Sequence, residues 1–112
     1  MARREVLTVD NLRIVYRILS IIEKKMEYAQ FDLSQLSPSA LGVSPELRNN
    51  LLCSIISAGY VEGATIKRNV LGEISIDLEN ARLSIAGMEY LSENSVMQKI
   101  ARAAKGIAEV VL

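Results

Sequence analysis

Apolar residues recur every three to four positions through the first quarter of the chain, which is the spacing of one buried stripe on a helix. They are Ile14, Val15, Ile18, Leu19, Ile22 and Met26. We therefore predict an amphipathic helix that is capped by Asp10 and buries this stripe. The opposite face carries Arg13, Arg17 and Lys24, and it is either a solvated helix face or a row of phosphate contacts.

Two helix starts and a tight turn follow between residues 36 and 63. Ser37-Pro38 and Ser44-Pro45 each place a capping hydroxyl before a proline at the first helical position, where the missing N–H costs nothing. Gly42 and Gly59 stand where left-handed residues would end the two helices. The pattern predicts a helix-turn-helix over residues 37–58.

The segment beyond the second helix changes from helical spacing to a period of two. Ile74 and Ile76 alternate with polar residues, and a polar tip at Lys67-Arg68-Asn69 precedes them. We predict a β-hairpin, the wing of a winged helix, over residues 60–78. Phe31 and Leu33 alternate around Asp32, so residues 30–33 predict a brief strand ahead of the helix-turn-helix.

The last part of the chain returns to helical patterns. Ser84 is placed to cap a short helix, and Ser95 with Gln98 forms a capping-box signature for a last helix over residues 95–112. Apolar residues cover more than half of that last helix. It is either docked deeply in its own domain or part of a homodimer interface. The candidate dimer residues are Ile100, Ala104, Ile107 and Val111.

Together these elements predict one domain over residues 1–112, mainly α with a small β-sheet. The fold class is a winged helix-turn-helix with an additional C-terminal helix. Half of the 112 residues are apolar, which is enough for a real core. The 13 basic and 13 acidic residues balance, so binding to nucleic acid cannot rest on net charge.

The composition also excludes several kinds of catalytic and metal-binding site. A single cysteine and no histidine exclude an internal disulfide, a Cys/His zinc site and a histidine base within one chain. The glycines do not form a phosphate-binding loop. We therefore predict no enzymatic activity, cofactor, metal or small-molecule substrate. No apolar run approaches the roughly 20 residues of a membrane span and no signal peptide is recognisable, so we predict a cytoplasmic protein without a membrane partner.

The second helix of a helix-turn-helix reads base edges in the major groove. Its predicted buried side here consists of Leu47, Leu51, Leu52, Ile55 and Ala58. Asn49 and Asn50 lie on the outward face and are the candidate base readers, since asparagine pairs bidentately with adenine. Arg48 falls nearer the buried side and reaches outward only by extending its stem.

Basic side chains outside that helix are the candidate phosphate contacts. They are Arg17, Lys67 and Arg68. The predicted partner is double-stranded DNA, and the predicted role is that of a non-enzymatic binding protein or transcriptional regulator. The alternative is a protein-interaction or oligomerisation module that does not bind DNA, which the neutral charge keeps open.

The sequence resembles the YjcQ-like family of small winged-helix proteins of Gram-positive bacteria and their prophages. The resemblance covers most of the chain, and its most specific part is the run Gly87-Met88-Glu89-Tyr90-Leu91-Ser92-Glu93-Asn94-Ser95. Further matches are Phe31-Asp32-Leu33, Ser37-Pro38-Ser39-Ala40-Leu41-Gly42, Asn49-Asn50 and Gly59-Tyr60-Val61. The resemblance implies a winged helix-turn-helix and a phage or mobile-element setting. It brings no catalytic or binding residues with it.

Overall fold

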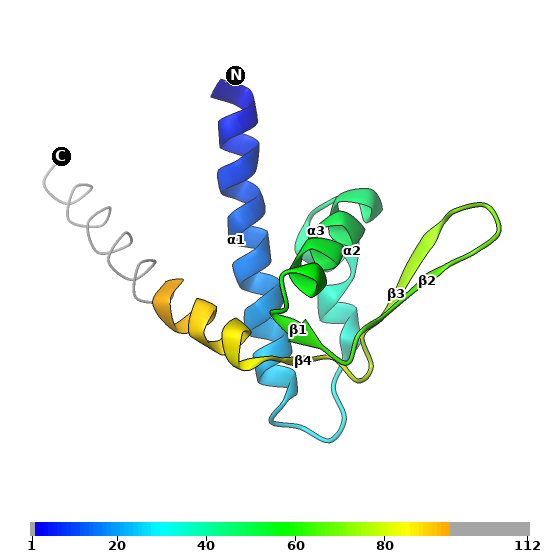
Figure 1. Ribbon diagram of the computed structural model, residues 1–112. Coiled ribbons are helices and arrows are strands. Elements are labelled where there is room, and N and C mark those ends of the chain that lie inside the picture. Colours follow the sequence, from blue (N-terminus) through cyan, green and yellow to red (C-terminus); the bar gives the residue numbers. More distant parts are fainter. Residues whose placement is uncertain (1, 95–112) are drawn as a thin grey trace, which may run out of the picture.

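Helices form most of the structure, and two short antiparallel strand pairs complete it (Figure 1). The computed structural model describes the backbone of residues 2–94 and the side chains of residues 11–94. The elements are α1 (Ala2–Lys25), the 3-10 helix η1 (Leu33–Leu36), α2 (Pro38–Leu41), α3 (Pro45–Ser57), β1 (Val61–Glu62), β2 (Thr65–Arg68), β3 (Ile74–Asp77) and β4 (Arg82–Leu83). A further helix spans residues 85–94.

The helix-turn-helix forms where the capping residues predict it. The Ser37 hydroxyl accepts the Ala40 N–H at 3.2 Å, and the Ser44 hydroxyl accepts the Leu47 N–H at 3.1 Å. Each cap satisfies a helical N–H that has no intrahelical partner. Gly42 ends α2 with a φ of 72°, in the left-handed region that glycine adopts without steric cost. These local signals set the boundaries of both helices.

The strands pair in two separate antiparallel ladders. β2 and β3 form the wing hairpin, in which Ile66 lies opposite Ile76 and Arg68 lies opposite Ile74. β1 pairs with β4, which arrives from beyond the wing, and Val61 lies opposite Leu83. Figure 1 shows the wing projecting away from α1 and from the body of the fold. The structure is therefore a winged helix-turn-helix with an additional helix after the wing.

The core lies where α1 meets the helix-turn-helix and the β1–β4 pair. Ile18, Leu19 and Ile22 of α1 have no exposed surface, which confirms the predicted stripe. Ile14 and Val15 are half-buried against this core. Met26 departs from the prediction, since α1 ends at Lys25 and Met26 is 43% exposed. The other core residues are Leu36, Leu41, Leu52, Ile55, Val61, Leu78, Ala81, Leu83 and Leu91.

The start of α1 differs from the prediction. The helix begins at Ala2, so Asp10 lies inside it and does not cap it. Residues 2–9 contain neither proline nor glycine, and nothing in them stops the helix from continuing toward the N-terminus. The capping interpretation of Asp10 was wrong.

The predicted strand at residues 30–33 was also wrong. The segment is a turn that leads into η1, and Asp32 is the N-cap of η1. Its carboxylate accepts the Ser34 N–H at 3.0 Å. Hydrogen bonds from Ser34 to this carboxylate lower the pKa of Asp32, because they favour its charged form. A local side-chain bond thus replaces the strand ladder as the partner of this backbone.

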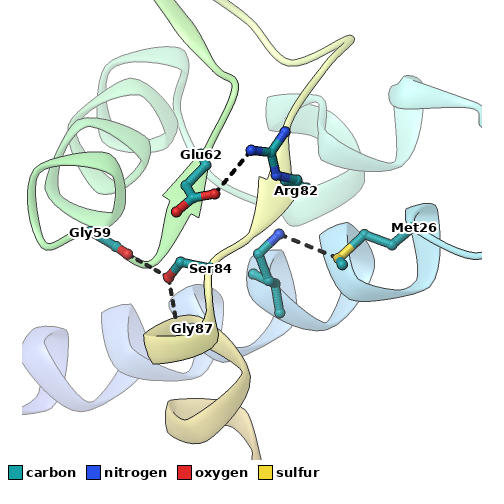
Figure 2. Close-up of polar contacts among 7 residues, drawn as sticks. Met26, Gly59, Glu62, Arg82, Ser84 and Gly87 are labelled. Carbon is teal, nitrogen blue, oxygen red and sulfur yellow. Dashed lines mark hydrogen bonds and ion pairs between the residues drawn. The ribbon is translucent and has the colours of Figure 1, made fainter.

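The predicted cap at Ser84 is confirmed, and Figure 2 shows its surroundings. The Ser84 hydroxyl accepts the Gly87 N–H at 3.1 Å and donates to the Gly59 carbonyl. The neighbouring Leu83 N–H donates to the Met26 sulfur at 3.4 Å, which links β4 to the end of α1. The Ser84 side chain therefore joins the segment after α3 to the helix of residues 85–94.

The predicted helix over residues 95–112, with its candidate dimer residues, lies outside the described residues.

Candidate nucleic-acid interface

The outward face of α3 is polar, as predicted. Glu46, Asn50, Ser54 and Ser57 are exposed along it, while Leu52 and Ile55 are buried on the opposite side. Ala58 was expected on the buried side, but it is exposed because α3 ends at Ser57 and Ala58 is its C-cap. This helix therefore presents hydrogen-bonding groups and one carboxylate to solvent.

The two candidate base readers have different surroundings. Asn49 is half-buried, and its side-chain amide donates to the Ile74 carbonyl of β3 at 3.2 Å. Its side-chain oxygen accepts a hydrogen bond from the Arg48 guanidinium at 3.1 Å. Asn50 is exposed, and its side chain makes no hydrogen bond within the described part of the chain. Of these two residues, Asn50 alone presents a side-chain amide without a hydrogen bond to the described part of the fold.

The guanidinium of Arg48 holds parts of the fold together. It is half-buried, and its Nε donates to the Leu36 carbonyl at the end of η1 at 3.0 Å. Burial lowers the pKa of Arg48, yet a guanidinium remains charged in proteins. A continuous path of hydrogen bonds therefore runs from Leu36 through Arg48 and Asn49 to Ile74. It connects η1, α3 and the wing.

The two basic residues of the wing point to opposite faces of the hairpin. Successive side chains of a strand alternate, so Arg68 shares a face with half-buried Ile74 and Ile76. Lys67 lies opposite Ser75 on the other face, which it shares with Asp77. Because α3 contacts β3, the face with Arg68 is the one that turns toward α3.

The tip of the wing is shifted from its predicted place. Lys67 and Arg68 belong to β2, and the turn itself comprises residues 69–73. Val70 and Leu71 lie at this turn and are 103% and 79% exposed. This apolar pair was not predicted, although two apolar residues inside an otherwise polar hairpin turn are visible in the sequence.

Arg17 is engaged within the protein. Its guanidinium donates to the Ala40 carbonyl in α2 at 2.9 Å, so it fastens the helix-turn-helix to α1. The side chains of Asn50, Lys67 and Arg68 therefore lie at the surface without a hydrogen bond to the described residues, whereas those of Asn49 and Arg17 bond to backbone carbonyls. The acidic residues Glu46 of α3 and Glu73 and Asp77 of the wing hairpin reduce the positive potential there.

Other surface features lie apart from α3. A hollow of about 390 Å³ at the end of α1 is lined by Tyr28, Phe31 and Glu79 among others. Within the described residues, no group of three or more metal-ligating side chains is gathered, and no helix is long and apolar enough to cross a membrane.

The residues of this candidate interface all lie within the match to one protein family. The family model described as YjcQ protein matches residues 16–110. The chain belongs to the YjcQ family. The match begins within α1 and includes the helix-turn-helix, the wing and the β1–β4 pair of this YjcQ-family protein. The resemblance inferred from the sequence is thus confirmed. No curated protein and no solved structure matches the chain.

Proposed function

We propose that this YjcQ-family protein is a non-enzymatic DNA-binding protein that contacts duplex DNA with α3 and the wing. The hydrogen bond from Asn49 to the Ile74 carbonyl supports the proposal best, because it fixes the wing to the reading helix. With α3 in the major groove, the first turns of the helix face the base edges. Asn50 is then the base reader, and its amide matches the edge of adenine.

The wing supplies phosphate contacts in this arrangement. Lys67 and Arg68 are exposed, adjacent in sequence and on opposite faces of a two-stranded hairpin. They therefore reach phosphates on both sides of the hairpin, where such contacts fix the register without reading sequence. The balanced charge of the chain makes non-specific binding weak. Affinity must then come from these few placed contacts.

A salt titration of binding to random-sequence duplex DNA tests this function. The logarithm of the affinity should fall linearly with the logarithm of salt concentration, with a slope of about −0.9 for each neutralised phosphate. Lys67→Ala should make the slope shallower by about 0.9, because one contact is lost. Lys24→Ala removes the same exposed charge from α1 and should leave the slope unchanged. A flat salt response, or no binding at low salt, would contradict DNA binding.

The two asparagines should separate base reading from wing support. After a preferred duplex has been selected from a random pool, Asn50→Ala should relax the preference at one position by about 1–3 kcal/mol. Its unfolding free energy should stay within about 0.5 kcal/mol of wild type, because the side chain is exposed. Asn49→Ala should instead destabilise the fold by about 1 kcal/mol, since the Ile74 carbonyl loses its donor. Binding selection and urea denaturation measure the two effects, and equal stability losses would mean that the roles are misassigned.

A further inference from the structure

The apolar pair at the wing tip has no partner among the described residues. Val70 and Leu71 have the highest exposures of the large hydrophobic side chains in that part of the chain, at 103% and 79%. Single exposed hydrophobic residues are ordinary on protein surfaces. Two adjacent ones at the end of a projecting hairpin place apolar surface at the point that first meets a ligand (Figure 1).

The turn that carries this pair is rigidly organised by Asn69. The Asn69 side-chain oxygen accepts the N–H groups of Leu71 and Glu73, each at 2.9 Å. Backbone bonds from Asn69 N–H to Glu73 and from Gly72 N–H to Asn69, each at 3.0 Å, close the same turn. A ligand that binds the tip therefore does not have to order the loop, because Val70 and Leu71 are already held in position before contact.

The size of the tip decides which partner it fits. A stable protein interface buries about 800 Å² on each partner, far more than two side chains provide. An apolar wedge between base-pair steps needs only one or two such side chains. Lys67 and Arg68 directly precede the turn and are placed to hold the phosphates that border the wedge. The one acidic side chain of the turn, Glu73, accepts a hydrogen bond from the Asn69 amide at 3.3 Å, which ties its carboxylate to the loop.

We propose that Val70 and Leu71 form an apolar wedge that enters the minor groove of duplex DNA beside α3 and partly unstacks a base-pair step. This inference rests on the proposed DNA binding of α3 and the wing. It adds that the protein bends its DNA. Pyrimidine–purine steps such as TA unstack most easily, so the wedge favours them over stiff A-tracts.

Fluorescence energy transfer between dyes at the two ends of a short duplex tests the wedge with the full chain. One duplex carries a central TA step and the other an A-tract. Wild type at saturation should bend the TA duplex by an angle in the range of about 20–90° and the A-tract duplex less. Leu71→Ser and Val70→Ser should abolish most of the bend, while Leu71→Met should retain it because methionine is also a wedge residue.

Ile85→Ser is the matched control. It removes an apolar side chain that is 70% exposed in the helix of residues 85–94, and the bend should remain. Leu71→Ser should weaken binding by no more than about tenfold, because losing the wedge also saves the cost of unstacking.

The outcomes distinguish the wedge from DNA binding itself. A wild-type protein that binds DNA without bending it overturns the wedge and leaves the function of α3 and the wing intact. A bend that survives both serine variants also overturns the wedge, because it means that other contacts bend the DNA. Complete loss of binding in Leu71→Ser overturns it as well, because it means that the tip carries the affinity. No binding of wild type to either duplex at low salt overturns both proposals.

Discussion

Gly63→Ala should lower the free energy of unfolding by about 3 kcal/mol, although it adds only one methyl group. Gly63 lies between β1 and β2 with a φ of 80°, a conformation that costs an alanine about 1–2 kcal/mol. A Cβ at this position would also overlap the backbone carbonyl oxygen of Asn80, which approaches from the connection between β3 and β4. Backbone cannot rotate away as a side chain can, so the overlap adds about 1–3 kcal/mol. Urea denaturation of the two proteins measures the difference.

Gly72→Ala is the matched control for this substitution. Gly72 has nearly the same φ, 82°, but a Cβ there meets nothing within 4 Å. The control should therefore lose only the conformational part, about 1 kcal/mol, and its smaller loss isolates the effect of the Asn80 carbonyl. Equal losses in the two variants would mean that the loop of Asn80 moves aside freely.

The elements that the sequence predicts correctly depend on neighbouring residues. Ser37, Ser44 and Gly42 act on backbone groups within one helical turn, so their types and spacing are sufficient to place α2 and α3. The same is true of Ser84, whose hydroxyl meets the N–H three residues later. The α1 stripe follows from helical periodicity alone, and Ile18, Leu19 and Ile22 are buried accordingly.

The incorrect predictions concern choices between local and distant partners. Residues 30–33 alternate as a strand does, but an unpaired strand leaves its backbone groups unsatisfied. Asp32 offers a closer partner through its side chain, and β4 pairs with β1 instead. No local pattern reveals that β4, about fifty residues further along the chain, pairs with β1.

In the candidate interface, too, the sequence predicts features that depend on neighbouring residues and does not predict contacts with distant residues. Helical spacing places Asn50 on the exposed face of α3, but it contains no information about the wing. The Ile74 carbonyl, 25 residues away in sequence, accepts a hydrogen bond from the half-buried Asn49 amide, which no helical pattern reveals. Arg17 is likewise taken by the Ala40 carbonyl. The opposite directions of Lys67 and Arg68, by contrast, follow from strand alternation once β2 is known to include both.

Leu52→Ala should cost about 3 kcal/mol of unfolding free energy, within the range of about 2–5 kcal/mol for deleting a buried leucine side chain. Leu52 lies on the side of α3 opposite the polar face and has no exposed surface. Its removal leaves a cavity in the core where α3 meets α1. Because domains of this size are stable by only about 5–15 kcal/mol, the loss is readily measured by thermal or urea denaturation.

Leu51→Ala is the matched control, since it makes the same chemical change at the neighbouring, half-buried position. It should cost less than half as much, because the site is already partly open to water. At a temperature where both variants remain folded, their DNA affinities should equal that of wild type, since neither residue lies on the polar face of α3. Asn50→Ala should show the reverse pattern, with unchanged stability and altered sequence preference. If Leu52→Ala weakens DNA binding while it is fully folded, the polar face depends on the core beneath it, and α3 cannot be treated as a rigid platform.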